Sequence, residues 1–164
     1  MDEEVEEMLK MDKLIETNPS TPADEGMFGV FQHSMDSKGR LFVPSRLREA
    51  LGSPFYVMVG FGNYLLAFPA AKWRMIMAKI YEIPLTESPR FRIALANAAK
   101  CEPDKQGRFL LPIKLRQRAE LVDEVTIIGQ GDHAEIWNSA AYDAIEQKFF
   151  AEGDLAKDMK ALGF

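Results

Sequence analysis

Two copies of a charged turn are the part of this chain whose residue types and spacing could do chemistry. Residues 36–48 read DSKGRLFVPSRLR, and residues 104–116 read DKQGRFLLPIKLR, with six identical positions 68 residues apart. An arginine in such a turn can bind the O6 and N7 acceptors of guanine with two hydrogen bonds, while a lysine more often meets phosphate. The pair of turns therefore suggests recognition of a nucleic acid.

We divide the residues of the two turns into two groups by the chemistry of their side chains. The basic ones are predicted to contact DNA: Lys38, Arg40, Lys105 and Arg108. The others are predicted to structure the loop: Asp36, Gly39, Asp104 and Gly107. An aspartate at the start of a turn accepts backbone N–H bonds and can orient an arginine, although its charge would repel phosphate. A glycine supplies a positive φ and keeps the loop slim enough for a close approach.

Each Asp–Arg pair also has a plainer interpretation as a local ion pair across a turn, worth roughly 0–1 kcal/mol. Taken singly, either pair favours this plainer interpretation. The repetition, the flanking lysines and the family resemblance given below together favour the DNA interpretation. The segment after each motif proline carries four more cations: Arg46, Arg48, Lys114 and Arg116. For these, phosphate contacts and salt bridges between subunits fit equally well.

The repetition extends beyond the turns and predicts the architecture. Residues 59–68 align with residues 128–137 at an offset of 69. Each copy predicts a charged turn, a short strand, a helical turn opened by Pro44 or Pro112, and a hairpin. A further strand is expected over residues 27–33, before the first turn. The two repeats, residues 29–73 and 97–142, are expected to close on one another.

The remaining segments are assigned from composition and periodicity. Residues 1–26 hold nine acids, two lysines and few apolar side chains, so we predict an acidic, disordered leader. Residues 74–96 are predicted to form a helical linker, in which Ser88 is the N-cap of the second helix. Residues 143–164 are predicted to form C-terminal helices, the last capped by Asp154.

The distribution of charge is more informative than the net charge of −5 over 164 residues. The leader carries −7 and the rest of the chain +2, with the basic residues concentrated in the two repeated loci. This pattern favours a polyanionic partner. The one cysteine, Cys101, is expected to be a small buried side chain in a reducing compartment. The acidic N-terminus and the lack of a long apolar run predict a cytosolic protein.

No constellation in the sequence supports catalysis, a metal site or a cofactor. His33 and His133 occupy non-equivalent positions in the two repeats and lack ligand spacing. Trp73 and Trp137 are expected in the core rather than as stacking platforms. We therefore expect no enzymatic activity and no small-molecule substrate. The competing hypothesis is a protein-interaction scaffold that uses its basic loops as assembly contacts.

The two Asp-x-x-x-Arg turns, the opening Met27-Phe28-Gly29 and the stretch from Gly129 to Trp137 resemble the MraZ family. The resemblance covers about residues 27–160. It implies an α+β, mainly β fold: a double-split β-barrel of two tandem SpoVT/AbrB-like half-barrel repeats with flanking helices. It also implies a nucleoid-associated bacterial transcription regulator of the division and cell-wall gene cluster. In such proteins a homo-oligomeric ring binds direct repeats in promoter DNA, and the signature arginines correspond to Arg40 and Arg108.

Overall fold

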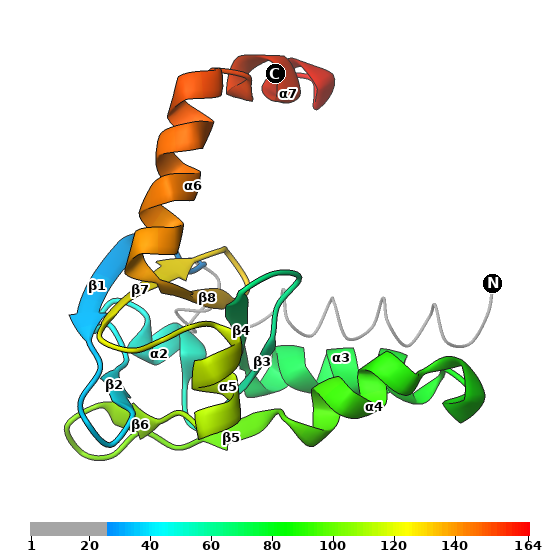
Figure 1. The fold of residues 1–164 in the computed structure, drawn as a ribbon. Coiled ribbons are helices and arrows are strands. Elements are labelled where there is room, and N and C mark those ends of the chain that lie inside the picture. Colours follow the sequence, from blue (N-terminus) through cyan, green and yellow to red (C-terminus); the bar gives the residue numbers. More distant parts are fainter. Residues whose placement is uncertain (1–25) are drawn as a thin grey trace.

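The computed structural model describes residues 26–164 of the chain (Figure 1). The predicted acidic leader, residues 1–26, lies outside the described residues except for Gly26. Within the described part, no helix has the length and apolarity needed to cross a membrane.

Eight strands and seven helical segments are described. The strands are β1 Val30–Ser34, β2 Arg40–Phe42, β3 Phe55–Val59, β4 Tyr64–Pro69, β5 Ala99–Cys101, β6 Arg108–Leu110, β7 Glu124–Gly129 and β8 Ala134–Asn138. The helices are α2 Arg48–Leu51, α3 Ala70–Tyr81, α4 Pro89–Ala96, α5 Ile113–Arg118, α6 Ser139–Glu152 and α7 Leu155–Ala161, with a 3-10 turn, η2, at Leu85–Glu87.

The two repeats are interlocked, because each gives its first strand to the hairpin of the other. The main sheet has the order β1-β7-β8-β4-β3-β5, and β2 pairs with β6 in a separate two-stranded ribbon. Val30 of β1 thus faces Ile128 of β7, and Cys101 of β5 faces Phe55 of β3. The two hairpins meet where β4 pairs with β8. The predicted α+β fold of two tandem half-barrels that close on one another is confirmed.

Equivalent positions of the two repeats fill one shared core. The matching buried pairs are Leu41 and Phe109, Val43 and Leu111, Leu47 and Leu115, and Leu51 and Ala119. Phe55 meets Phe109 edge to face, with ring centroids 5.0 Å apart. Because both repeats bury the same face against each other, removing one would expose the core of the other.

Local details differ from the prediction at three places. The first strand begins at Val30 rather than residue 27, since Gly29 has a φ of 110° and Met27 forms only an isolated bridge to Gly131. Helix α2 begins at Arg48, four residues after Pro44, because the Leu47 N–H bonds to the Pro44 carbonyl at 2.8 Å and closes a tighter turn first.

The third difference concerns the helix caps. Ser88 and Asp154 stand at the N-cap positions of α4 and α7, but neither side chain caps its helix. The Ser88 hydroxyl donates instead to the Leu85 carbonyl at 3.5 Å.

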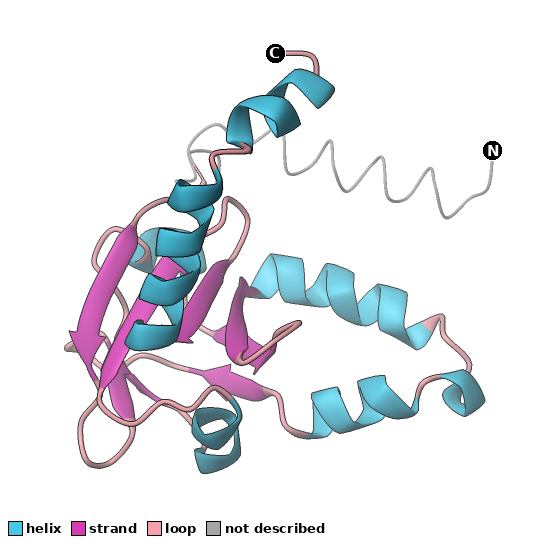
Figure 2. Ribbon diagram, turned by 45° about the horizontal axis from the view of Figure 1, so that its top comes forward, coloured by secondary structure: helices cyan, strands magenta, loops and turns pink. Residues whose placement is uncertain are grey.

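The helices outside the barrel form two projections (Figure 2). Helices α3 and α4 make a helical arm on one side, and α6 leaves the sheet in another direction with α7 at its end. Side chains on α6 and α7 are mostly exposed, including Phe150 and Leu155. These projections leave apolar surface available for contacts with other molecules.

Candidate nucleic-acid interface

The first motif turn is held by one carboxylate. Asp36 Oδ1 accepts hydrogen bonds from the backbone N–H groups of Lys38 and Arg40, both at 2.9 Å. Asp36 Oδ2 accepts from Arg40 Nε at 2.6 Å. Gly39 closes the turn with a φ of 83°, and its N–H donates to the Asp36 carbonyl at 3.0 Å. A single side chain therefore fixes both the backbone and the arginine.

The second turn has the same construction. Asp104 Oδ1 accepts from the N–H groups of Gln106 at 2.9 Å and Arg108 at 3.0 Å, and Oδ2 accepts from Arg108 Nε at 3.0 Å. Gly107 has a φ of 81° and donates to the Asp104 carbonyl at 2.9 Å. The sequence repeat is thus also a repeat of hydrogen bonds.

These contacts keep both aspartates charged. The N–H of Arg40 lowers the pKa of Asp36, against partial desolvation that raises it, and the Arg40 side chain lowers it further. The pKa of Asp104 is lowered in the same way, first by the N–H of Arg108. Within the described structure, neither guanidinium uses its outer nitrogens in a hydrogen bond. Each arginine is therefore oriented through Nε, with two nitrogens left to bind an acceptor.

The β2–β6 ribbon places both arginines on one face. Arg40 lies opposite Leu110 and Phe42 lies opposite Arg108, so all four side chains point to the same side of the ribbon. The intervening residues, Leu41 and Phe109, point into the core. We call the solvent side the ribbon face, defined by Arg40, Phe42, Arg108 and Leu110.

Two members of the ribbon face were missed by the sequence reasoning. Phe42 is 40% exposed and Leu110 is 57% exposed, although both are large and apolar. The period-2 alternation around the buried Leu41 and Phe109 is the signal that places them outward. An exposed apolar pair between two arginines is chemically suited to bind the methyl groups of thymine.

Each motif glycine is covered by an arginine of the other repeat. A methyl group built on Gly39 would lie 2.5 Å from Cζ of Arg116, and one built on Gly107 would lie 2.6 Å from Cζ of Arg48. Both glycines are buried. The group that lies close to each glycine in this structure is an arginine side chain. The backbone ties the turns together as well, since Val43 N–H donates to the Gly107 carbonyl at 2.9 Å.

The two covering arginines differ in their hydrogen bonds. Arg48 Nε donates to the Val43 carbonyl at 3.0 Å. Arg116 Nε is buried and has no partner among the described residues. Both were predicted to contact phosphate or another subunit, and the structure places both against the motif turns. The signal in the sequence for this matching placement is that Arg48 and Arg116 occupy equivalent positions of the two repeats, 68 residues apart.

Within the described residues, the other candidate groups do not assemble into a metal site. The described residues contain no group of three or more His, Cys, Asp or Glu side chains that could hold a metal. Cys101 is 3% exposed, and burial raises the pKa of its thiol to about 12, which keeps it protonated and inert.

The two tryptophans are not core residues, contrary to the prediction. Trp73 and Trp137 are half-buried. Trp73 stacks on Tyr56 with ring centroids 5.0 Å apart, and Trp137 stacks on Tyr64 at 4.4 Å. Trp73 lies in α3 just after the first hairpin, and Trp137 lies in β8 opposite Tyr64 of β4. Each indole therefore packs flat on a tyrosine of the sheet instead of entering the core.

Two interlocked half-barrels that join paired Asp–Arg turns into one basic ribbon define a tandem-repeat barrel protein. The chain belongs to the MraZ family: the family model for the MraZ protein, described as antitoxin-like, matches residues 27–93 and again residues 94–164. The predicted family and its internal repeat are confirmed. The matched segments also take in the helices after each hairpin, and our narrower repeat boundaries stay a prediction.

Relatives match this chain over most of their length. The transcriptional regulator MraZ of Carboxydothermus hydrogenoformans is 42% identical over 134 residues, which is 73% of this chain and 94% of the relative. The protein of the same name from Lactiplantibacillus plantarum is 38% identical over 136 residues, covering 80% and 96%. That from Pediococcus pentosaceus is 37% identical over 139 residues, covering 82% and 97%.

Proposed function

We propose that this chain is a DNA-binding transcriptional regulator that reads promoter DNA with the ribbon face. The names of its relatives support the general function. The observation that carries the site is the geometry of the ribbon, which puts Arg40 and Arg108 on one face with each guanidinium held by a carboxylate.

The proposed recognition is direct readout in the major groove. A two-stranded ribbon is narrow enough to enter this groove, and the free outer nitrogens of an arginine match O6 and N7 of guanine. Because Asp36 and Asp104 hold Arg40 and Arg108 before binding, little side-chain freedom is lost on contact. The exposed Phe42 and Leu110 would then meet thymine methyl groups between the two arginines.

Lys38 and Lys105 are assigned to the phosphates on either side of the groove. Both are exposed and neither forms an ion pair with another described residue. Such contacts position the protein without reading sequence, and they make binding salt-dependent.

The proposed function also includes the oligomeric assembly of the protein and the genes that it regulates. The residues after the leader carry a net charge of only +2, so one subunit would bind DNA weakly. A homo-oligomeric ring that engages several repeated promoter boxes would gain affinity by linkage. We propose that such a ring regulates the division and cell-wall gene cluster at the nucleoid in the cytoplasm. The proposal involves no cofactor, no small-molecule substrate and no enzymatic step.

A mobility-shift experiment tests this function. The probe is the promoter region upstream of the protein's own gene, at low and at high salt. Arg40→Ala/Arg108→Ala should weaken specific binding by roughly tenfold or more for each arginine removed. The control, Lys157→Ala/Lys160→Ala, removes the same charge from α7 and should bind almost like the wild type. Light scattering establishes that all variants still assemble.

An interaction scaffold is the second candidate, favoured by the exposed Phe42 and Leu110 on the ribbon face. Under this alternative the basic turns hold subunits or a protein partner together. The same variants separate the two functions. Loss of assembly in Arg40→Ala/Arg108→Ala, or no specific DNA binding by a folded wild type, would support the scaffold.

A further inference from the structure

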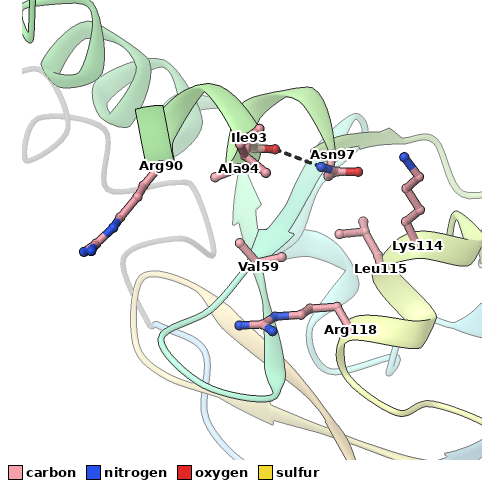
Figure 3. A pocket seen from close by; sticks show the side chains of 8 residues that line it. All are labelled: Val59, Arg90, Ile93, Ala94, Asn97, Lys114, Leu115 and Arg118. Carbon is pink, nitrogen blue, oxygen red and sulfur yellow. Dashed lines mark hydrogen bonds between the residues drawn. The ribbon is translucent and has the colours of Figure 1, made fainter. Parts of the chain in front are cut away.

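A hollow with an apolar floor and a basic rim lies between α4, α5 and the end of β3 (Figure 3). Its volume is about 360 Å³. The floor is formed by Val59, Ile93, Ala94 and Leu115, and the rim carries Arg90, Lys114 and Arg118. Ile93 is 67% exposed, which is unusual for a large apolar side chain in the middle of a helix.

The cations of the rim have no acidic partners in the described structure. Arg90, Lys114 and Arg118 are exposed, and none of them forms an ion pair with another described residue. Figure 3 shows Lys114 and Arg118 extending from α5 on either side of Leu115. A surface with apolar contacts at its centre and positive charge around them fits an acidic amphipathic segment.

The chain itself contains a segment of that chemistry. Residues 1–16 include seven acids, and Val5, Met8 and Leu9 have the i, i+3, i+4 spacing that places side chains on one face of a helix. We propose that residues 1–16 dock in this hollow, with those apolar side chains on its floor and the acids against its rim. The charges of −7 in residues 1–26 and +2 in the remainder favour such a contact.

The connecting segment can reach about as far as the domain is wide. Residues 17–26 span at most roughly 36 Å when extended. A domain with the 139 described residues has a diameter of about 37 Å for its expected radius of gyration. The two prolines at positions 19 and 22 favour an extended course for this connection.

Docking would also place negative charge beside the proposed DNA site. Lys114 and Arg118 lie on α5, which follows β6 directly and also carries Arg116, the arginine over Gly39. The docked segment would therefore lower DNA affinity at low salt. This consequence rests on the proposed function, whereas the docking itself does not.

Disulfide trapping in the full-length chain tests the docking. Leu9→Cys/Ile93→Cys should form its disulfide with a yield several-fold above that of the control Leu9→Cys/Phe150→Cys, whose second cysteine is exposed on α6. The native Cys101 is buried and will not compete. Adding Arg118→Glu, or raising the salt concentration, should reduce the yield to that of the control. Equal yields in both pairs would overturn the proposal.

Hydrogen exchange gives a second readout that needs no engineered cysteine. Replacing Val5, Met8 and Leu9 with serine should speed exchange several-fold in residues 90–97 and 113–118, and leave α6 unchanged. Unchanged exchange overturns the docking. If Arg118→Glu instead changes the mass of the assembly, a second copy of the chain occupies the hollow and the proposal is also wrong.

DNA binding by the same serine variant separates this proposal from the proposed function. A several-fold gain in affinity at low salt supports both docking and competition with DNA. Docking without a change in affinity overturns only the competition. Docking in a protein that binds no DNA would contradict the proposed function and leave the docking intact.

Discussion

The two motif turns are alike in what holds them and differ in what surrounds them. Each has an aspartate that binds two backbone N–H groups and one arginine Nε, but the Nε–Oδ2 distance is 2.6 Å in the first turn and 3.0 Å in the second. The covering arginines differ more. Arg48 has a carbonyl partner, and the buried Arg116 Nε has none. The turn geometry is thus kept while its support differs between the repeats.

A second difference lies after the motif helices. Gly52 ends α2 with a φ of 69°, and the equivalent Glu120 follows α5 with a φ of 54°. Glycine takes this conformation without strain, whereas a residue with a Cβ does not. The fold places a residue with a positive φ at this position in both repeats, and only the first repeat supplies a glycine. The comparison therefore separates what the fold requires from what each sequence provides.

The largest effect on stability is expected at the motif glycines. Gly39→Ala should lower the free energy of unfolding by about 2–4 kcal/mol, because the left-handed backbone and the displaced Arg116 both contribute. Gly107→Ala should cost less, since the exposed Arg48 can move away. Urea unfolding measures both. Gly131→Ala is the matched control, with a φ of 78° and open space around its Cβ, so only the backbone contribution of about 1–2 kcal/mol should remain. Equal losses at Gly39 and Gly131 would contradict the covering role of Arg116.

The aspartates should matter next, through DNA affinity. Asp36→Asn removes the charge that holds Arg40 and should weaken specific binding several-fold, which a mobility shift measures. Asp104→Asn should weaken it less, because its bond to Arg108 is longer.

The same carboxylates give a pH dependence. Their folded pKa values lie below the ordinary 3.8, so the stability they contribute is present above pH 3.8 and is lost as pH falls through the lower folded values. Acid unfolding of Asp36→Asn/Asp104→Asn should therefore be flatter than that of the wild type below pH 3.8. Parallel curves would show that neither carboxylate is linked to folding.

The covering arginines offer a smaller and asymmetric test. Arg48→Met removes a hydrogen bond to the Val43 carbonyl, and a loss of about 1 kcal/mol is expected. Arg116→Met removes a buried donor without a partner while keeping the apolar stem, so its stability should stay close to that of the wild type. Thermal unfolding of the two variants measures the difference. A larger loss for Arg116→Met would show that its Nε has a partner in solution.

The smallest expected effect is a gain. Glu120→Gly should raise the free energy of unfolding by about 0.5–1 kcal/mol, because glycine relieves the left-handed backbone at that position. At the equivalent position, Gly52→Ala should lower it by about 1–3 kcal/mol, because Gly52 has a φ of 69° and a ψ of −165°, a conformation essentially restricted to glycine. A destabilised Glu120→Gly would mean that the glutamate side chain makes a contact that compensates for its backbone.

The sequence could predict the turns because the repeat carries the residues that form them. The positive φ at Gly39 and Gly107, the strand after each, and the buried Leu41 and Phe109 follow from local chemistry and alternation. The exchange of β1 and β5 between the repeats did not follow, since either hairpin offers a similar apolar edge and the choice depends on how the whole sheet closes.

Long-range contacts of charged residues were the other feature that could not be predicted from the sequence. The positions of Arg48 and Arg116 over glycines of the opposite repeat depend on the interlocked topology and not on their own helices. The positive φ of Glu120 could not be predicted from its residue type. The alignment of Glu120 with Gly52 does indicate it. Helix caps at Ser88 and Asp154 failed for the opposite reason, as the right residue types stand there without making the bond.

Photocrosslinking from position 42 tests most directly whether the ribbon face reads DNA. Phe42 is replaced by a photoreactive phenylalanine analogue in the full-length protein, which is irradiated with labelled promoter DNA. The matched control carries the analogue in place of Phe150, which is exposed on α6. The account predicts a covalent DNA adduct from position 42 and none from position 150. A protein–protein adduct from position 42, without attachment to DNA, would contradict it and assign the ribbon face to assembly.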